Sequence, residues 1–262
     1  MIICRTTFDD DDIIAGQGSC GLEILEQLPQ IQTLVVPVGG GGLISGMAIA
    51  IKALKPDVKI IGVQTEAVPS LAESFWQGRI VHPAPRPTLA DGIAIKQPAE
   101  RNFELLQAHV DEMLTVSEDA ISRALFFAIQ YKHLIAEGAG VVGLAALLEG
   151  KVAATGPTVV VLSGGNIDVK LLDSIINKGM NDKGRFLIFR TLIHDTPGSL
   201  KKVLNLLAQQ KANVLHIQHA RFRSNIPINC TEIEVELETR DAAHAQEIIT
   251  ALSAKGYTVQ GL

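Results

Sequence analysis

Cysteine is scarce in this chain of 262 residues, and the few cysteines follow no pattern. Cys4, Cys20 and Cys230 are widely separated, with neither a C-x-x-C spacing nor a spacing typical of metal ligands. The sequence therefore argues against a disulfide framework and predicts a reducing compartment, the cytoplasm.

An unbroken apolar run that could span a membrane is also missing. A long uncharged stretch, residues 31–51, is interrupted in its middle by Pro37 and by four glycines. An acidic run at residues 9–12 stands where a secretion signal would need apolar residues, and we interpret it as a solvated turn. We expect neither a membrane span nor a secretion signal.

Positive charge is not in excess either. The formal net charge is −5 at pH 7, and 47% of the residues are hydrophobic while 19% are charged, as in ordinary globular proteins. Residues 1–182 carry 13 Lys and Arg against 21 Asp and Glu, whereas residues 183–262 carry 10 against 7. This shift predicts two domains, 1–182 and 183–262. Since neither has a dense basic stripe, nucleic acid is not expected as a partner.

The first part alternates apolar runs of strand length with helical patterns, which predicts an α/β domain with a mostly parallel sheet and helices on both faces. The strand candidates are residues 34–38, 59–64, 112–116 and 158–162. The helix candidates are residues 21–28, 43–54, 117–135 and 139–149.

After residue 184 the pattern changes to short amphipathic elements in the order strand, helix, strand, strand, helix, strand. The clearest strand, Cys230–Glu238, alternates Ile233, Val235 and Leu237 with glutamates, so that one face is buried. Two helices each carry a single apolar stripe, formed by Leu200, Val203, Leu204 and Leu207 and by Ala245, Ile248, Ile249 and Leu252. The order is that of a ferredoxin-like βαββαβ domain.

Two glycine turns follow predicted strands. After residues 34–38 come Gly39, Gly40, Gly41, Gly42 and Leu43, where successive N–H groups and a helix start could hold a phosphate. After residues 158–162 come Ser163, Gly164 and Gly165, which would place a hydroxyl where ligands bind in parallel sheets. Each turn alone is also compatible with a plain strand-to-helix connection.

Five motifs in order resemble the threonine dehydratase and serine racemase family of fold-type II pyridoxal-phosphate (PLP) enzymes. They are Phe8 with Ile14-Ala15-Gly16-Gln17-Gly18, the run Gly39 to Leu43 with Gly46, Ala90-Asp91-Gly92, Glu137-Gly138-Ala139-Gly140, and Ser163-Gly164-Gly165-Asn166. Asp195-Thr196-Pro197-Gly198-Ser199-Leu200 and Ala212-Asn213 resemble an ACT domain, a module that senses amino acids. The combination resembles the single-ACT threonine ammonia-lyases, which implies a role in isoleucine biosynthesis.

The resemblance implies PLP as cofactor, with its phosphate held by residues 39–43 and its pyridine nitrogen by Ser163 beside Gly164. It also implies a homo-oligomer that dehydrates an amino acid, threonine or serine. Asp91 and Glu137 would belong to the substrate pocket or its proton network, although a turn former and a helix-start carboxylate are equally compatible with them.

The family's lysine, which forms a Schiff base with the cofactor, belongs to a Ser-Phe-Lys-x-Arg-Gly segment, and its substrate-carboxylate loop to a Ser-x-Gly-Asn-His segment. This sequence contains neither. Surface positions are expected for the lysines that could replace it: Lys52, Lys55, Lys59, Lys96 and Lys132. We therefore predict no catalytic residue in this chain, which would be a truncated enzyme or a regulatory remnant.

Some relatives hold a divalent metal through Glu and Asp where this chain has Gln64 and Ser70, so no metal site is predicted. By resemblance, Asp195, Pro197, Gly198, Ser199 and Asn213 would bind an amino-acid effector and regulate the enzyme allosterically; an ordinary helix cap also explains residues 195–199. His194, His216 and His219 are expected to be structural or solvated. Two alternative functions remain open, a non-catalytic amino-acid-binding regulator and another PLP activity such as serine racemisation.

Overall fold

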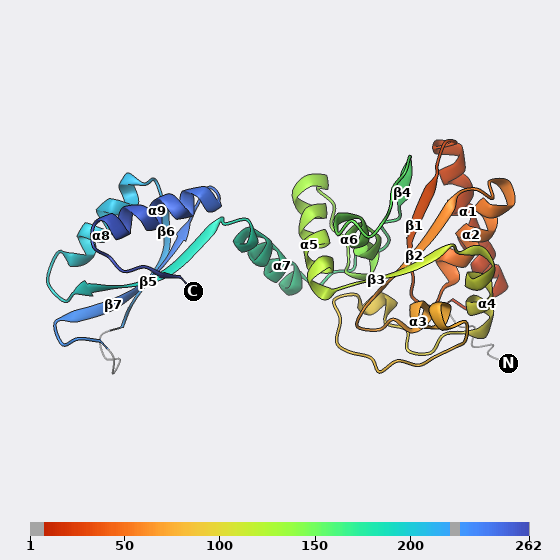
Figure 1. Cartoon of the computed structure of the whole chain (residues 1–262), viewed down its shortest axis with the longest axis horizontal. Coiled ribbons are helices and arrows are strands. Elements are labelled where there is room, and N and C mark those ends of the chain that lie inside the picture. Colours follow the sequence, from red (N-terminus) through yellow and green to blue (C-terminus); the bar gives the residue numbers. More distant parts are fainter. Residues whose placement is uncertain (1–7, 221–225, 262) are drawn as a thin grey trace. The chain divides into compact units, whose positions relative to one another are not determined.

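The computed structural model describes residues 8–220 and 226–261 and consists of two compact units (Figure 1). The first unit ends at Ile175 and the second begins at Ile176, so the division falls inside helix α7 (Val169–Asp182). The domain boundary predicted at 182/183 follows the last residue of this helix.

A four-stranded parallel sheet forms the centre of the first unit. Its strands are β1 (Thr33–Pro37), β2 (Lys59–Thr65), β3 (Glu112–Val116) and β4 (Thr158–Val160), and they lie in the order β3-β2-β1-β4. The chain therefore winds outward from β1 to β3 and then returns to the other side of β1. The strand order reverses between β1 and β4, and in open parallel sheets such a point is where ligands bind, beyond the carboxyl ends of the strands.

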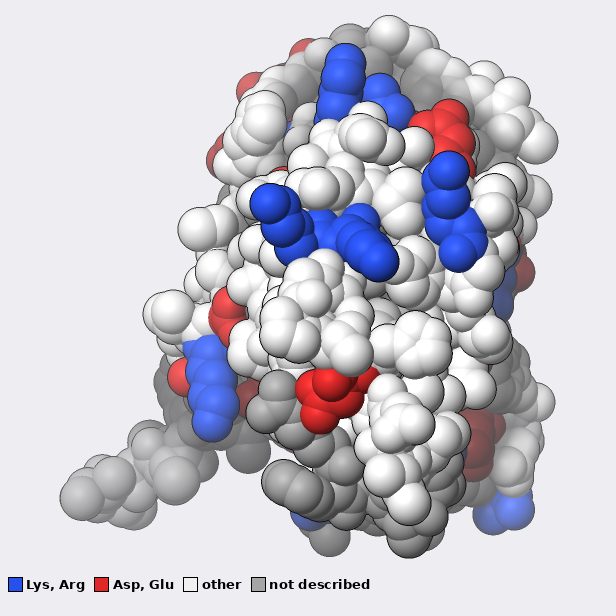
Figure 2. Space-filling view, turned by 90° about the vertical axis from the view of Figure 1, so that its left-hand side faces the viewer, with Lys and Arg blue, Asp and Glu red and all other residues white. Residues whose placement is uncertain are grey.

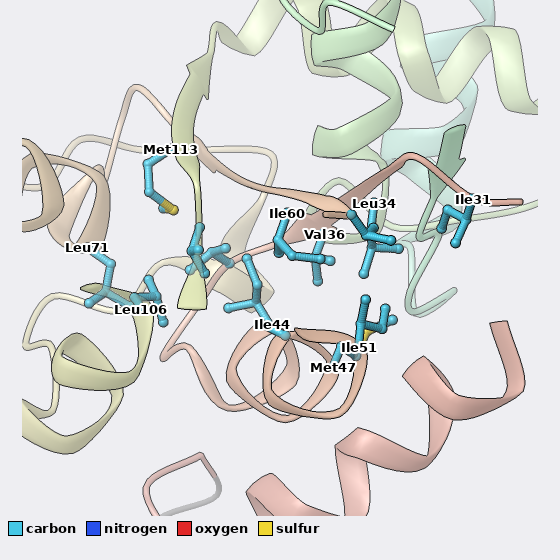
Figure 3. Packing of buried hydrophobic residues seen from close by; sticks show 14 of the residues in the cluster. Ile31, Leu34, Val36, Ile44, Met47, Ile51, Ile60, Leu71, Leu106 and Met113 are labelled. Atoms are coloured by element: carbon cyan, nitrogen blue, oxygen red, sulfur yellow. The ribbon is translucent and has the colours of Figure 1, made fainter. Parts of the chain in front are cut away.

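Helices cover both faces of this sheet. Helix α1 (Asp11–Gln27) precedes the first strand. The helices between the strands are α2 (Gly42–Leu54), α3 (Ser70–Gln77), α4 (Glu100–His109), α5 (Glu118–Phe127) and α6 (Val142–Leu148), with short helical turns at Asp91–Ile93, Ala128–Lys132 and Ala139–Val141. In Figure 3, Ile44, Met47 and Ile51 of α2 point toward Leu34, Val36 and Ile60 of the sheet. On the opposite face, Gly143 of α6 packs against Val35 and Val160. All five residues of β1 are buried, as expected of a central parallel strand.

The predicted parallel sheet is confirmed, but several helix predictions were incomplete. Helix α1 begins at Asp11, ten residues before the predicted start, because the acidic run is not a turn. Asp10 is the N-cap, accepting from the N–H groups of Asp12 and Ile13, while Asp11 and Asp12 lie in the first turn, where carboxylates are favoured. Helix α5 ends at Phe127, well short of residue 135. Helices α3, α4 and α7 were not predicted.

The second unit is a helix-on-sheet sandwich with its own core. Strands β5 (Phe186–His194), β6 (Asn213–Ala220), β7 (Cys230–Glu238) and the short β8 (Gln260–Gly261) form an antiparallel sheet in the order β6-β7-β5-β8. Helices α8 (Ser199–Gln209) and α9 (Ala242–Ala254) complete the predicted order of elements. Phe189, Val203, Leu207, Val235 and Ile248 are among the buried core residues.

Neither the surface charges nor the cysteines of the described residues indicate a particular binding partner. On the face that Figure 2 shows, Lys and Arg side chains appear as separate patches among mostly uncharged residues. Cys20 is exposed on α1 and Cys230 half-buried on β7, both as free thiols, while Cys4 lies outside the described residues. Within the described ranges, no helix is long and apolar enough to cross a membrane.

Candidate functional site

A cavity of about 380 Å³ opens where the strand order reverses. The loops that follow β1 and β4 both reach it, because the two strands are parallel neighbours and their carboxyl ends share one edge of the sheet. Its walls are Phe8, Ile13, Gln17, Pro37, Gly39, Gly40, Gly41, Gly42, Leu43, Gly92, Ile93, Ile95 and Ser163. The structure thus brings together the predicted glycine run and the predicted hydroxyl.

The backbone of the glycine run lines this cavity. Gly41 is the N-cap of α2 and adopts φ 95°, a left-handed conformation that favours glycine. Among the described residues, no backbone hydrogen bond is donated by the N–H groups of residues 39–42. Within residues 8–220 and 226–261, no Lys or Arg lines the cavity. An anion here would therefore be held by peptide groups and by the positive end of the α2 dipole.

Side chains are excluded from this loop by its close contacts. A Cβ atom on Gly39 would lie 3.2 Å from Cα of Ile93, one on Gly41 would lie 3.0 Å from Cβ of Asn102, and one on Gly42 would lie 2.8 Å from the carbonyl oxygen of Phe8. A Cβ on Gly40 would overlap the ring of Phe8. The missing side chains thus let the neighbouring segments close around the loop, whose four glycines line the cavity.

The turn that carries Ser163 is held by the Glu137 to Gly140 motif. The N–H of Glu137 donates to the carbonyl of Gly164 (3.3 Å), and the N–H of Ser163 donates to the carbonyl of Gly140 (3.4 Å). The Glu137 side chain is half-buried, and its Oε1 lies 3.3 Å from the position of a Cβ on Gly92, a residue of the cavity wall. Glu137 therefore joins Ser163 and Gly164 at the site, although it does not line the cavity itself.

Asp91 stands apart from these residues. Its side chain is exposed, accepts from the N–H of Gly92 (2.8 Å), and does not line the cavity, so its observed role is that of a turn former. The segment it belongs to is anchored by Glu118, whose carboxylate accepts from the hydroxyls of Thr65 (2.8 Å) and Thr88 (2.6 Å) and from the N–H of Leu89 (2.6 Å). Glu118 thereby fixes the approach of residues 92–95 to the cavity.

The lysines considered as replacements mostly lie elsewhere. Lys52, near the end of α2, pairs with Asp111 (2.8 Å), and Lys59, the first residue of β2, pairs with Glu112 (2.6 Å). Both are at the amino ends of the strands, opposite the cavity. Lys55 donates to the carbonyl of Pro29. Lys132 is exposed, as is Lys96, which follows the cavity residue Ile95 and lines an adjacent groove with Phe8.

Gln64 and Ser70 are buried and engaged in protein contacts. Oε1 of Gln64 accepts from the N–H of Ala72 (2.8 Å), and the hydroxyl of Ser70 donates to the carbonyl of Ile95 (2.6 Å). Across the part of the chain that the structure describes, no group of three or more His, Cys, Asp or Glu side chains could hold a metal ion.

In the second unit, the predicted effector residues do not come together. Asp195, Pro197, Gly198 and Ser199 follow the last residue of β5, with Gly198 (φ 89°) as the N-cap of α8. Asn213 begins β6 and pairs with Glu238, which also pairs with Phe186 at the first residue of β5. Asn213 therefore lies at the opposite end of the sheet. His194, His216 and His219 are exposed.

Two residues at the site carry roles that the sequence did not predict. Phe8 forms part of the wall and packs on Gly40. Asn102 of α4 is fully buried and donates to the carbonyls of Phe8 (2.7 Å) and Gly40 (2.9 Å). The only signal in the sequence is that Asn102 is a polar residue one turn before the buried Leu106, on the inward stripe of α4.

The fold and the cavity correspond to a known class of enzyme. Residues 2–164 match the family model of pyridoxal-phosphate dependent enzymes, so the chain belongs to this family. The processed form of threonine deaminase isoform 2 from Solanum lycopersicum is a structural neighbour with a TM-score of 0.62 and 35% identity, covering 66% of this chain and 51% of that chain. Maize serine racemase has a TM-score of 0.57 and 32% identity, covering 64% and 53%.

The chain also resembles a threonine ammonia-lyase along most of its length. It is 50% identical over 254 residues to the L-threonine ammonia-lyase of Thermotoga maritima, and this match covers 97% of the chain. The same match covers 63% of the Thermotoga maritima enzyme, so the chain spans less than two thirds of the length of this relative.

Proposed function

We propose that this chain is the cofactor-holding and regulatory portion of a PLP-dependent dehydratase that converts threonine, and also serine, to a 2-oxo acid and ammonia. The observation that carries the proposal is the meeting of the glycine loop and Ser163 at one cavity. The 50% identity to an L-threonine ammonia-lyase supports this substrate class.

The residues present fit PLP. Its phosphate would be bound by the N–H groups of Gly39, Gly40, Gly41, Gly42 and Leu43, in a cradle that side chains would fill. The hydroxyl of Ser163 would donate to the ring nitrogen, with Gly164 in the same turn. The apolar side chains of Phe8, Ile13, Ile93 and Ile95 would exclude water from the ring.

When bound, PLP supplies an electron sink for the carbon that carries the amino group of the substrate. A neutral hydroxyl at the ring nitrogen holds the ring in place without keeping it protonated, whereas a carboxylate would keep it protonated. Ser163 thereby favours loss of the β-hydroxyl group over transamination. Glu137, half-buried beside Gly92 and Gly164, would hold a proton near the substrate, and Asp91 would shape the turn at the pocket's edge.

Binding of PLP to the purified chain tests this assignment of the site. We expect equilibrium dialysis to detect PLP binding that inorganic phosphate competes away and that Gly41→Ala abolishes, because alanine at φ 95° is strained and meets Asn102. Gly78→Ala is the matched control, because Gly78 also has a positive φ (65°) but has no neighbour within 4 Å of its Cβ position and does not line the cavity. A chain that binds no PLP contradicts the proposal.

The absent lysine segment is tested by borohydride reduction in the presence of PLP, followed by peptide mass spectrometry. We expect no lysine of this chain to be labelled in proportion to bound PLP, since Lys52 and Lys59 are paired at the far edge of the sheet. Fusion to the part of the Thermotoga maritima enzyme that this chain does not match should then give 2-oxo acid formation from threonine. If the same fusion is given serine and the main product is racemised serine, the alternative function of serine racemisation is favoured.

For residues 183–262 we propose an ACT domain that binds an amino-acid effector and regulates the enzyme within a cytoplasmic homo-oligomer. The strand order β6-β7-β5-β8 supports this proposal, as does the start of α8, where no side chain of a described residue caps the helix. Because Asp195 and Asn213 lie at opposite ends of the sheet, an effector that contacts both would need residues from two chains.

A second candidate function is a non-catalytic amino-acid-binding regulator. It is favoured by the separate core of the second unit together with the absence of the lysine segment from this sequence. Calorimetry with isoleucine, valine and threonine distinguishes the candidates: amino-acid binding without any affinity for PLP supports the regulator and contradicts the enzyme.

A further inference from the structure

One buried carboxamide connects three separate segments behind the cavity. Nδ2 of Asn102 in α4 donates one hydrogen bond to the carbonyl of Gly40 (2.9 Å) and another to the carbonyl of Phe8 (2.7 Å). Asn102 has no exposed surface and does not line the cavity, whereas Gly40 and Phe8 both do. Asn102 can therefore act on a ligand only through the two segments that it holds.

We infer that Asn102 is a positioning residue for the phosphate-binding loop, an inference that rests on the proposed function. The peptide between Gly40 and Gly41 is planar and trans, so its carbonyl and its N–H point in opposite directions. By holding the carbonyl of Gly40 on the α4 side, Asn102 turns the N–H of Gly41 away from α4. Gly41 lines the cavity, so this N–H faces the space where a phosphate would bind.

The second hydrogen bond fixes the wall of the cavity relative to the loop. Phe8 packs its ring on Gly40, and its carbonyl oxygen lies 2.8 Å from the position that a Cβ on Gly42 would take. The chain at Phe8 can approach so closely because residues 40 and 42 are glycines. With its carbonyl held by Asn102, the ring of Phe8 stays at the mouth of the loop.

Toward the described part of the chain, the side chain of Asn102 acts only as a hydrogen-bond donor. Both protons of Nδ2 are used, while Oδ1 is buried and has no partner among the described residues. A buried acceptor without a donor costs free energy, so the carboxamide is not at an optimum for its own stability. What it provides is two donors at one atom, which an aspartate or a leucine of similar shape cannot supply.

Matched substitutions separate positioning from simple stabilisation. Asn102→Leu removes both donors at nearly constant shape. Gln64→Met is its control in the same unit, since Gln64 is equally buried and holds the backbone N–H of Ala72 instead of the loop. The measured quantity is the ratio of the dissociation constants of pyridoxal and PLP for the full chain, together with the 31P chemical shift of bound PLP.

We expect Asn102→Leu to lower this ratio by about tenfold or more and to move the 31P shift toward that of free PLP. The loss of phosphate contacts weakens PLP alone, whereas any displacement of Phe8 weakens both ligands and cancels in the ratio. Gln64→Met should lose thermal stability but keep both the ratio and the shift. If Asn102→Leu does not fold, Asn102→Thr is compared with Gln64→Met instead. Threonine supplies one hydroxyl donor in place of two and keeps most of the buried volume.

An unchanged ratio and 31P shift in the folded Asn102 variants would overturn the positioning role and leave the proposed function standing, provided that the unmodified chain binds PLP. A chain that binds no PLP before any substitution removes the proposed function, and the positioning role falls with it. A ratio that falls equally in Gln64→Met would also overturn the inference, because it would trace the effect to general loosening of the fold.

Discussion

The backbone of Ser163 lies directly against Gly140: a Cβ atom on Gly140 would stand 2.7 Å from the carbonyl carbon of Ser163 and would overlap its oxygen. The N–H of Ser163 donates to the carbonyl of Gly140 at the same contact. The position of the Ser163 hydroxyl in the cavity therefore depends on a residue with no side chain 23 positions earlier in the chain.

Replacing this glycine should displace Ser163. We expect Gly140→Ala to destabilise the first unit by about 1–3 kcal/mol, because a backbone atom must move, and to abolish PLP binding. Thermal unfolding and dialysis with PLP check the two effects. Gly16→Ala in α1 is the control: it has open space around its Cβ position and should stabilise the helix by roughly 0.5–1 kcal/mol. Equal effects at both positions would contradict the prediction.

Removing the hydroxyl of Ser163 should affect the ligand and not the fold. Ser163 is half-buried, and no hydrogen bond of its hydroxyl to another described residue is observed. We expect Ser163→Ala to weaken PLP binding roughly three- to tenfold, the range of one neutral hydrogen bond, with little change in the unfolding temperature. Ser174→Ala, at an exposed hydroxyl of α7 that donates to Lys170, should change neither quantity. Full PLP affinity in Ser163→Ala would show that the hydroxyl does not contact the ring.

Glu118 should be important for the wall formed by residues 92–95. Glu118→Gln leaves Thr65, Thr88 and Leu89 to share one carboxamide oxygen, so we expect a loss of about 1–3 kcal/mol in the free energy of unfolding. Hydrogen exchange at the amides of residues 89–93 should accelerate. The neighbouring Asp119→Asn, which weakens an exposed pair with Arg123, should have little effect on either measurement. Unchanged exchange at residues 89–93 in Glu118→Gln would count against the anchor.

In the second unit, the buried His244 connects the two helices that cover the sheet. Nδ1 accepts from the N–H of Arg240 (3.1 Å) and Nε2 contacts the carbonyl of Gln210 (2.7 Å), so the ring carries its proton on Nε2. His244→Leu leaves both backbone groups without this partner, and we expect a loss of about 1–3 kcal/mol, measured as faster hydrogen exchange in α9. His216→Leu, at an exposed position on β6, should leave that exchange unchanged. Slow exchange retained in His244→Leu would refute the link.

The sheet of the first unit was predictable because each of its strands is a short apolar run bounded by turn residues. The glycine loop and the Ser163 turn were predictable because they follow these runs directly, and strand direction then places them at one edge. The start of α1 was missed because four consecutive acidic residues indicate a solvated segment unless the capping role of Asp10 is weighed against their charge.

The residues that support the site could not be derived in this way. Asn102 reaches Phe8 and Gly40 across 94 and 62 positions of sequence, and Glu118 reaches Thr65 and Thr88 across 53 and 30. Such contacts depend on how helices pack on the sheet, and no local pattern encodes them. The only related feature in the sequence is a polar residue on the apolar stripe of a helix, as for Asn102 on α4.

The proposed effector residues Asp195 and Asn213 lie far apart on the second sheet, which affects how the domain would bind an amino acid. β5 and β6 run in the same direction, since each is antiparallel to β7, and nine residues of β5 separate the loop at Asp195 from the end at Asn213. At about 3.3 Å per residue this is on the order of 25–30 Å, several times the length of an amino acid. A ligand that touches both ends must bridge two molecules, so its apparent affinity would rise with protein concentration, and saturating ligand would drive association.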